Sequence, residues 1–120
     1  MGDNANSEPA RNGHKPPLEV AVCSGPARSW VTLTGDLDLV SAPQLQRVLD
    51  QLCRDGCSEV VVDLTGLDFL GAVGLGVLLR ADDQLRATGA RLILYRPPRG
   101  ARRILAITEL DTVLTIRSGE

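Results

Sequence analysis

Aromatic side chains and histidine are scarce in this 120-residue chain. Its three aromatic residues are Trp30, Phe69 and Tyr95, so we expect a core built from leucine, valine and isoleucine. His14 is the one histidine and lies in a polar stretch. General base catalysis and metal binding both need further side chains positioned beside a histidine. We therefore expect neither role for His14.

Long hydrophobic segments are missing as well. No window of about 18 apolar residues predicts a transmembrane helix, and the N-terminus lacks the apolar segment of a secretory signal. The formal net charge of -2 gives no electrostatic reason to bind nucleic acid or an anionic membrane. Length and composition predict one domain. We expect a cytoplasmic protein that contacts neither nucleic acid nor a membrane directly.

Three cysteines, Cys23, Cys53 and Cys57, are too few and too oddly spaced for a metal site. A structural zinc site needs a second pair of ligands, which the sequence does not provide. Cytosolic thiols are normally reduced, which argues against a disulfide framework. Two alternatives remain: the thiols pack as small apolar groups, or they form a redox switch. We expect no metal and no cofactor.

Two strands and a helix are predicted in the first half of the chain. Residues 1–17 contain no Leu, Ile, Val or Phe, so we expect a disordered tail there. The pattern predicts strands at 18–23 and 29–33, joined as a hairpin by turn-forming residues. Ser41 is a favourable N-cap for a helix that continues to Cys53.

The stretch 60–79 is the most informative part of the sequence. Its apolar, β-branched start at 60–64 predicts a buried third strand. A polar turn that includes Asp68 is expected next, before a helix that starts within two or three residues of Ala72 and stops at Gly89. The first turn of this helix is rich in glycine, at Gly71, Gly74 and Gly76.

A strand at 91–95, a helix at 102–108 and a turn with a short strand at 110–116 complete the pattern. Strands that alternate with helices indicate an α/β fold, and the opening hairpin makes the sheet mixed. We predict one domain at 18–117 with a four- to five-stranded sheet and helices mainly on one face. Residues 118–120 are expected to form a C-terminal tail.

Glycine is about 1 kcal/mol less favourable than alanine inside a helix, so the glycines indicate a close approach to the backbone. No Lys-Ser/Thr follows as in a P-loop, and the third glycine of a dinucleotide fingerprint would fall at Leu79. The stretch instead resembles the centre of a STAS domain of the anti-sigma factor antagonist family. Phe69, Gly74, Leu75 and Gly76 match the family motif.

Two further blocks extend the resemblance over residues 18–117: Gly35-Asp36-Leu37-Asp38 before a helix, and a C-terminal pattern at 102–116. The resemblance implies a non-enzymatic bacterial regulator of transcription and stress response. It would bind an anti-sigma factor with a histidine-kinase-like ATPase fold and thereby release a sigma factor. The implied docking residues are Asp38, Asp68, Gly71, Ala72, Val73, Gly74, Leu75 and Gly76.

One position departs from the family motif. The family's Asp-Ser-Ser stands at Gly71, Ala72 and Val73 here, so the hydroxyl that the partner kinase phosphorylates is absent. Val73 takes its place. We therefore predict that the partner does not phosphorylate this turn, and that the protein is constitutively competent or controlled through its cysteines.

Other interpretations stay open on sequence grounds. The glycines could merely permit tight helix–sheet packing, and the domain could be a scaffold or sensor that binds another protein or a small ligand. Four carboxylates could also gather at one sheet edge as a metal or hydrolase site, although aspartates commonly serve turns: Asp36, Asp38, Asp63 and Asp68. No nucleophile–base pair accompanies them, so we do not expect an enzyme.

Overall fold

The computed structural model describes residues 18–119, and the predicted tail at 1–17 lies outside them. Within this range the strands are β1 (Leu18–Ser24), β2 (Arg28–Leu37), β3 (Glu59–Leu70), β4 (Arg91–Tyr95) and β5 (Thr115–Arg117). The helices are α1 (Ala42–Arg54), α2 (Ala72–Ala87), α3 (Arg99–Ile107) and the short 3-10 helix η2 (Leu110–Thr112). No helix of the described part is long and apolar enough to cross a membrane.

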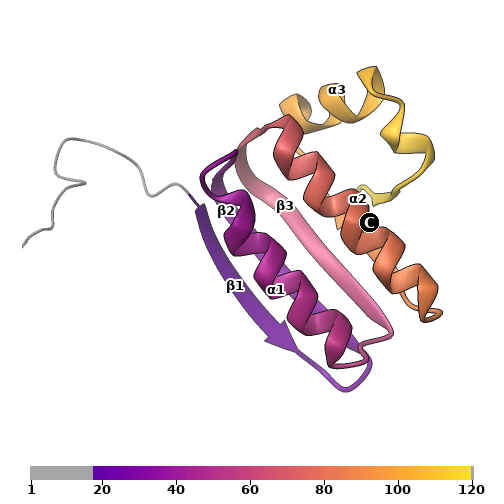
Figure 1. The fold of residues 1–120 in the computed structure, drawn as a ribbon. Helices are drawn as coiled ribbons and strands as arrows, with labels where there is room; N and C mark the ends of the chain where they lie inside the picture. Colours follow the sequence, from indigo (N-terminus) through magenta and orange to yellow (C-terminus); the bar gives the residue numbers. More distant parts are fainter. Residues whose placement is uncertain (1–17, 120) are drawn as a thin grey trace, which may run out of the picture.

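The five strands are arranged in sequence order, β1-β2-β3-β4-β5. β1 pairs with β2 in antiparallel fashion, and the other pairs are parallel. Each parallel connection, from β2 to β3, β3 to β4 and β4 to β5, moves to the next strand in the same direction across the sheet. Crossovers between parallel strands are right-handed in almost all proteins, so the helices of these connections lie on the same face of the sheet. Figure 1 shows α1 and α2 side by side on one face of the sheet. The predicted mixed sheet of four or five strands is confirmed, and so is the placement of its helices.

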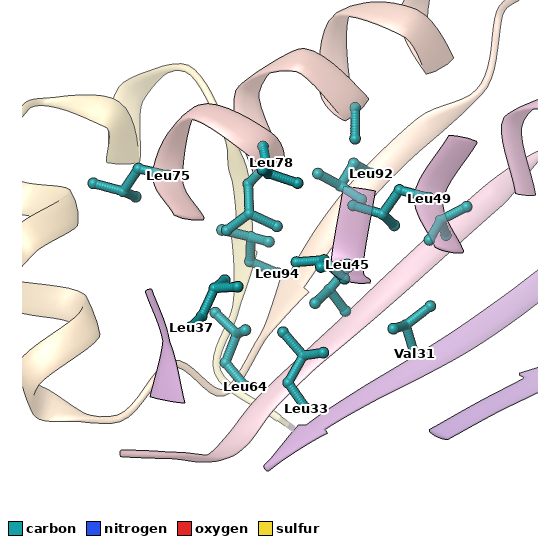
Figure 2. Packing of buried hydrophobic residues seen from close by; sticks show 14 of the residues in the cluster. Val31, Leu33, Leu37, Leu45, Leu49, Leu64, Leu75, Leu78, Leu92 and Leu94 are labelled. Carbon is teal, nitrogen blue, oxygen red and sulfur yellow. The ribbon is translucent and has the colours of Figure 1, made fainter. Parts of the chain in front are cut away.

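Aliphatic side chains fill the layer between the helices and the sheet. Leu33, Leu64 and Leu94 of the sheet are fully buried against Leu45 and Leu78 of the helices, and Figure 2 shows them meeting in one cluster. Full burial of such a side chain contributes roughly 1.5–3 kcal/mol. The cluster is aliphatic, as the scarcity of aromatic residues predicts.

The two central strands are longer than predicted. β3 continues to Leu70, so the polar turn expected after residue 64 is wrong. Asp63 Oδ1 accepts bonds from the amide and the hydroxyl of Thr65, at 2.9 and 2.6 Å, while the strand pairing continues past them through register shifts. β2 likewise continues to Leu37, with Gly35 at a φ of 105° that favours glycine. The two strands therefore end together, with Leu37 paired to Leu70.

The helix boundaries follow the sequence signals more closely. α2 begins at Ala72, as predicted, and Gly89 follows its last turn with a φ of 83°. Ser41 is the N-cap residue of α1, but its hydroxyl donates to the carbonyl of Asp36 at 2.7 Å and caps no helical amide. α3 begins at Arg99, three residues earlier than expected.

Candidate protein-docking surface

The carboxyl ends of β2 and β3 bring two loops together at one edge of the sheet. One loop leads from β2 into α1 and the other from β3 into α2. The amide of Gly71 donates to the carbonyl of Leu37 at 2.9 Å and ties the second loop to the first. Loops at the carboxyl ends of parallel strands are where open α/β sheets bind their ligands.

Four apolar side chains are exposed at this edge: Leu39 and Val40 on the loop from β2 to α1, Phe69 near the end of β3, and Val73 in the first turn of α2. Leu39 and Val40 are 72% and 77% exposed, while Phe69 and Val73 are 54% and 45% exposed. We call these four residues the strand-end surface. Large exposed apolar side chains gathered in this way indicate a site of protein contact.

Sequence analysis places Val73, and the turn at 68–76 that contains Phe69, in the docking site. It misses Leu39 and Val40. A signal was present, because two apolar residues directly before the N-cap Ser41 belong to no strand or helix and have no core to enter.

A hollow of about 210 Å³ adjoins Phe69 where β3 meets α3.

Asp38 shapes the loop that displays Leu39 and Val40. Its Oδ1 atom accepts hydrogen bonds from the amides of Ser41 and Val40 and from the Ser41 hydroxyl, each at 3.1 Å. These bonds, led by the one from the Ser41 amide, lower the pKa of the Asp38 carboxyl. Asp38 thus serves the local turn.

The glycine-rich turn separates into an exposed and a buried part. Ala72 and Gly76 are exposed, and a Cβ at Gly76 would meet nothing within 4 Å. A Cβ at Gly74 would lie 2.6 Å from Leu37 Cγ, and Leu75 is buried in the core. Gly74 and Leu75 are therefore corrected from docking residues to packing residues, because atoms in the interior cannot contact a partner of the folded protein.

The four carboxylates considered as a metal or hydrolase site do not all lie at one sheet edge, because Asp63 is set apart from the others. Asp63 lies at the level of Thr32 in the middle of β3, whereas Asp36 lies near the strand end opposite Phe69. Asp68 is exposed near the end of β3. Within residues 18–119, no three His, Cys, Asp or Glu side chains come close enough to hold a metal ion.

The three thiols are all free. Cys23 is exposed on β1, and Cys57 is buried beside the carbonyl of Glu59, 3.1 Å from its sulfur. Burial, followed by the charge of Asp50, raises the pKa of Cys53. A higher pKa lowers the thiolate fraction and with it the reactivity, so Cys53 is poorly suited to a redox switch.

Comparison with known proteins places the chain in a family. The family model described as "Mlab, STAS domain" matches residues 20–116. The chain belongs to the STAS domain family. The match spans every strand and helix of the described part except the first two residues of β1 and the last of β5.

Several relatives of this STAS domain are named anti-sigma factor antagonists. RsfB of Mycobacterium tuberculosis, an anti-sigma-F factor antagonist, is 29% identical over 68 residues, which are 57% of this chain and only 56% of RsfB. The anti-sigma-B factor antagonist of Staphylococcus aureus is 25% identical over 74% of this chain and 82% of its own. An anti-sigma factor antagonist from Mycobacterium paratuberculosis superimposes with a TM-score of 0.75 at 26% identity, over 82% of this chain and 84% of that one.

Proposed function

We propose that this STAS domain is an anti-sigma factor antagonist. It binds an anti-sigma factor with a histidine-kinase-like ATPase fold and thereby releases a sigma factor. The observation that carries the proposal is the strand-end surface, where Leu39, Val40, Phe69 and Val73 are exposed at one edge of the sheet. Relatives named as antagonists share the fold. The action is competitive binding and needs no catalytic group.

Three features fit the strand-end surface for a protein partner. Its apolar side chains lose water contact on binding, which provides a driving force of roughly 25 cal/mol per Å². Asp38 holds the first loop in one shape through three hydrogen bonds, so little conformational entropy is lost on binding. The hollow beside Phe69 offers space for one apolar side chain of the partner.

We further propose that phosphorylation at the usual position does not control this protein. Val73 stands where the family motif has the phosphorylated hydroxyl, and its side chain is exposed at the first turn of α2. Phosphate would add about -1.5 to -2 charges to an apolar surface and oppose docking. Without an acceptor hydroxyl, the binding-competent form persists in the presence of ATP.

The proposal is tested by placing a charge on the surface and, separately, on a matched control. Val73→Asp should weaken binding of a kinase-like anti-sigma factor by at least about tenfold, because a desolvated carboxylate is unfavourable in an apolar interface. Val113 is 48% exposed against 45% for Val73, and it lies outside the strand-end surface. Val113→Asp is therefore the control and should bind as wild type does.

Binding is measured by isothermal titration calorimetry, and release of the sigma factor is measured by displacement from its complex with the anti-sigma factor. Thermal unfolding of both variants confirms that each remains folded. Wild-type affinity for Val73→Asp, or an equal loss in both variants, would remove the strand-end surface as the docking site.

A further inference from the structure

The face of the sheet opposite the helices carries its own small apolar cluster. Val61 and Ile93 are 4% and 3% exposed, yet they lie outside the main core. Successive side chains of a strand point to opposite faces. Since the preceding residues Val60 and Leu92 face the helices, Val61 and Ile93 point to the other face of the sheet. Cα pairing places Val61 beside Ile93 and beside Trp30. The burial on this face therefore comes from side chains of the sheet itself.

Two of the three aromatic residues of the chain provide that cover. Trp30 of β2 and Tyr95 of β4 flank β3, and their ring centroids lie 5.1 Å apart with an 82° angle between the planes. Their rings meet across the strand that carries Val61. Both residues are partly exposed, so an aromatic wall faces solvent on a side of the domain that takes no part in the strand-end surface.

A hollow of about 450 Å³ opens beside this wall. That volume lies in the range of about 300–1,000 Å³ typical of small-molecule sites. Val61, Ile93, Trp30 and Tyr95 line it, together with two charged side chains, Arg28 and Arg117. Among residues 18–119, no carboxylate lines the hollow.

The two arginines differ in how far their charge is compensated. Arg28 donates through Nε to Glu59 at 2.5 Å. Within residues 18–119, the guanidinium of Arg117 has no ion pair or hydrogen bond, although its carbonyl accepts from the amide of Arg96 at 2.8 Å. The side chain of Arg96 adds further positive charge, 6.0 Å from the centre of the Tyr95 ring.

We propose that this hollow binds a planar aromatic carboxylate. The ring of the ligand lies over Val61 and Ile93 against the half-exposed aromatic wall, and its carboxylate pairs with Arg117. Aromatic rings prefer such offset or edge contacts, and a guanidinium can hold a carboxylate through two parallel hydrogen bonds. The site gives the domain a means of sensing a small molecule independently of its protein partner.

Trp30 is the single tryptophan of the chain, so its indole N–H is one identifiable NMR signal. The full chain, labelled with ¹⁵N, is titrated with 2-naphthoate and with 2-naphthamide. The carboxylate should shift the Trp30 signal and the amides around Ile93. The uncharged amide should bind about tenfold more weakly, because it cannot form the charged pair with Arg117.

Arg117→Gln should weaken the carboxylate about tenfold and leave the carboxamide unchanged. Arg103→Gln, on the exposed side of α3, removes the same charge elsewhere and should change neither. An absent Trp30 shift, equal binding of the two probes, or an equal effect of the two variants would overturn the proposal. So would a Trp30 signal that moves on dilution of the protein alone, or on addition of the anti-sigma factor, since a second protein would then cover the hollow.

Discussion

Replacing Gly74 by alanine, and separately Gly76, tests why the first turn of α2 is rich in glycine. The two positions are two residues apart on one helix and receive the same methyl group. At Gly76 this methyl meets open space, whereas at Gly74 it would lie 2.6 Å from Leu37 Cγ, 2.9 Å from Leu37 Cδ2 and 3.2 Å from Leu70 Cδ1. The structure therefore predicts changes of opposite sign.

The expected magnitudes follow from two competing terms. Alanine in place of glycine stabilises a helix by about 1 kcal/mol, and Gly76→Ala should show this gain. At Gly74 the new carbon lies well inside the optimal separation of about 3.5–4.0 Å, and Leu37 is fully buried with no space to move into. Overpacking of this kind costs about 1–3 kcal/mol. The free energy of unfolding should thus differ by about 1–3 kcal/mol between the variants.

Urea unfolding, followed by circular dichroism, measures this difference directly. For a domain of this size each kcal/mol also shifts the Tm by about 4–8 °C. A double-mutant cycle with Leu37→Ala adds a second readout, because the smaller residue makes room for the methyl group. The coupling energy should be favourable, within the range of about 0.5–3 kcal/mol seen for residues in contact. Equal stabilisation by both glycine substitutions, or additivity in the cycle, would refute the packing argument.

Three further predictions concern individual side chains. The folded protein holds the pKa of Asp38 below its ordinary value of 3.8, so this carboxylate stabilises the fold above that pH and the contribution is lost as the pH falls through the lower, folded value. In Asp38→Asn, the free energy of unfolding measured with urea should therefore fall less steeply at acidic pH than in wild type. Parallel pH curves for the two proteins would contradict this. Arg86→Met removes the Nε that lies 2.9 Å from buried Asp82 and also a bond to the carbonyl of Val113. Asp82 Oδ1 already has no partner among the described residues, so the free energy of unfolding, measured with urea, should fall by about 1–3 kcal/mol. Adding Asp82→Leu to the same chain should recover part of this loss. An Arg86→Met variant as stable as wild type would exclude this role for Arg86. Val73→Ser should gain one phosphate by intact-mass analysis after incubation with a kinase-like anti-sigma factor and ATP, whereas phosphate mapped to residues 68–76 of the wild type would contradict the absence of an acceptor.

Local signals in the sequence were sufficient for the order and type of the elements. The apolar run at 60–64, the N-cap at Ser41 and the glycine after α2 each act over a few residues, so chain periodicity and turn chemistry identify them. The mixed sheet with helices on one face also followed, because right-handed crossovers leave few alternatives. The motif around Phe69 identified the family.

Tertiary pairing decided what the local signals left open. β3 continues through Asp63 and Thr65 because β2 supplies hydrogen bonds past a register shift, which no window of β3 alone reveals. Gly74 is a packing residue only because Leu37, far away in sequence, fills the space above it. Burial and pairing across the sheet are properties of distant residues brought together, and these determine which residues of a recognised motif are left for a partner.

The same reason explains the residues that sequence analysis missed. Leu39 and Val40 are ordinary apolar residues until the fold shows that their side chains are exposed. Trp30 and Tyr95 are 65 positions apart and on non-adjacent strands, yet their rings touch across β3. Sequence determined which elements form and in what order, whereas exposure and contact between distant side chains exist only in the folded chain.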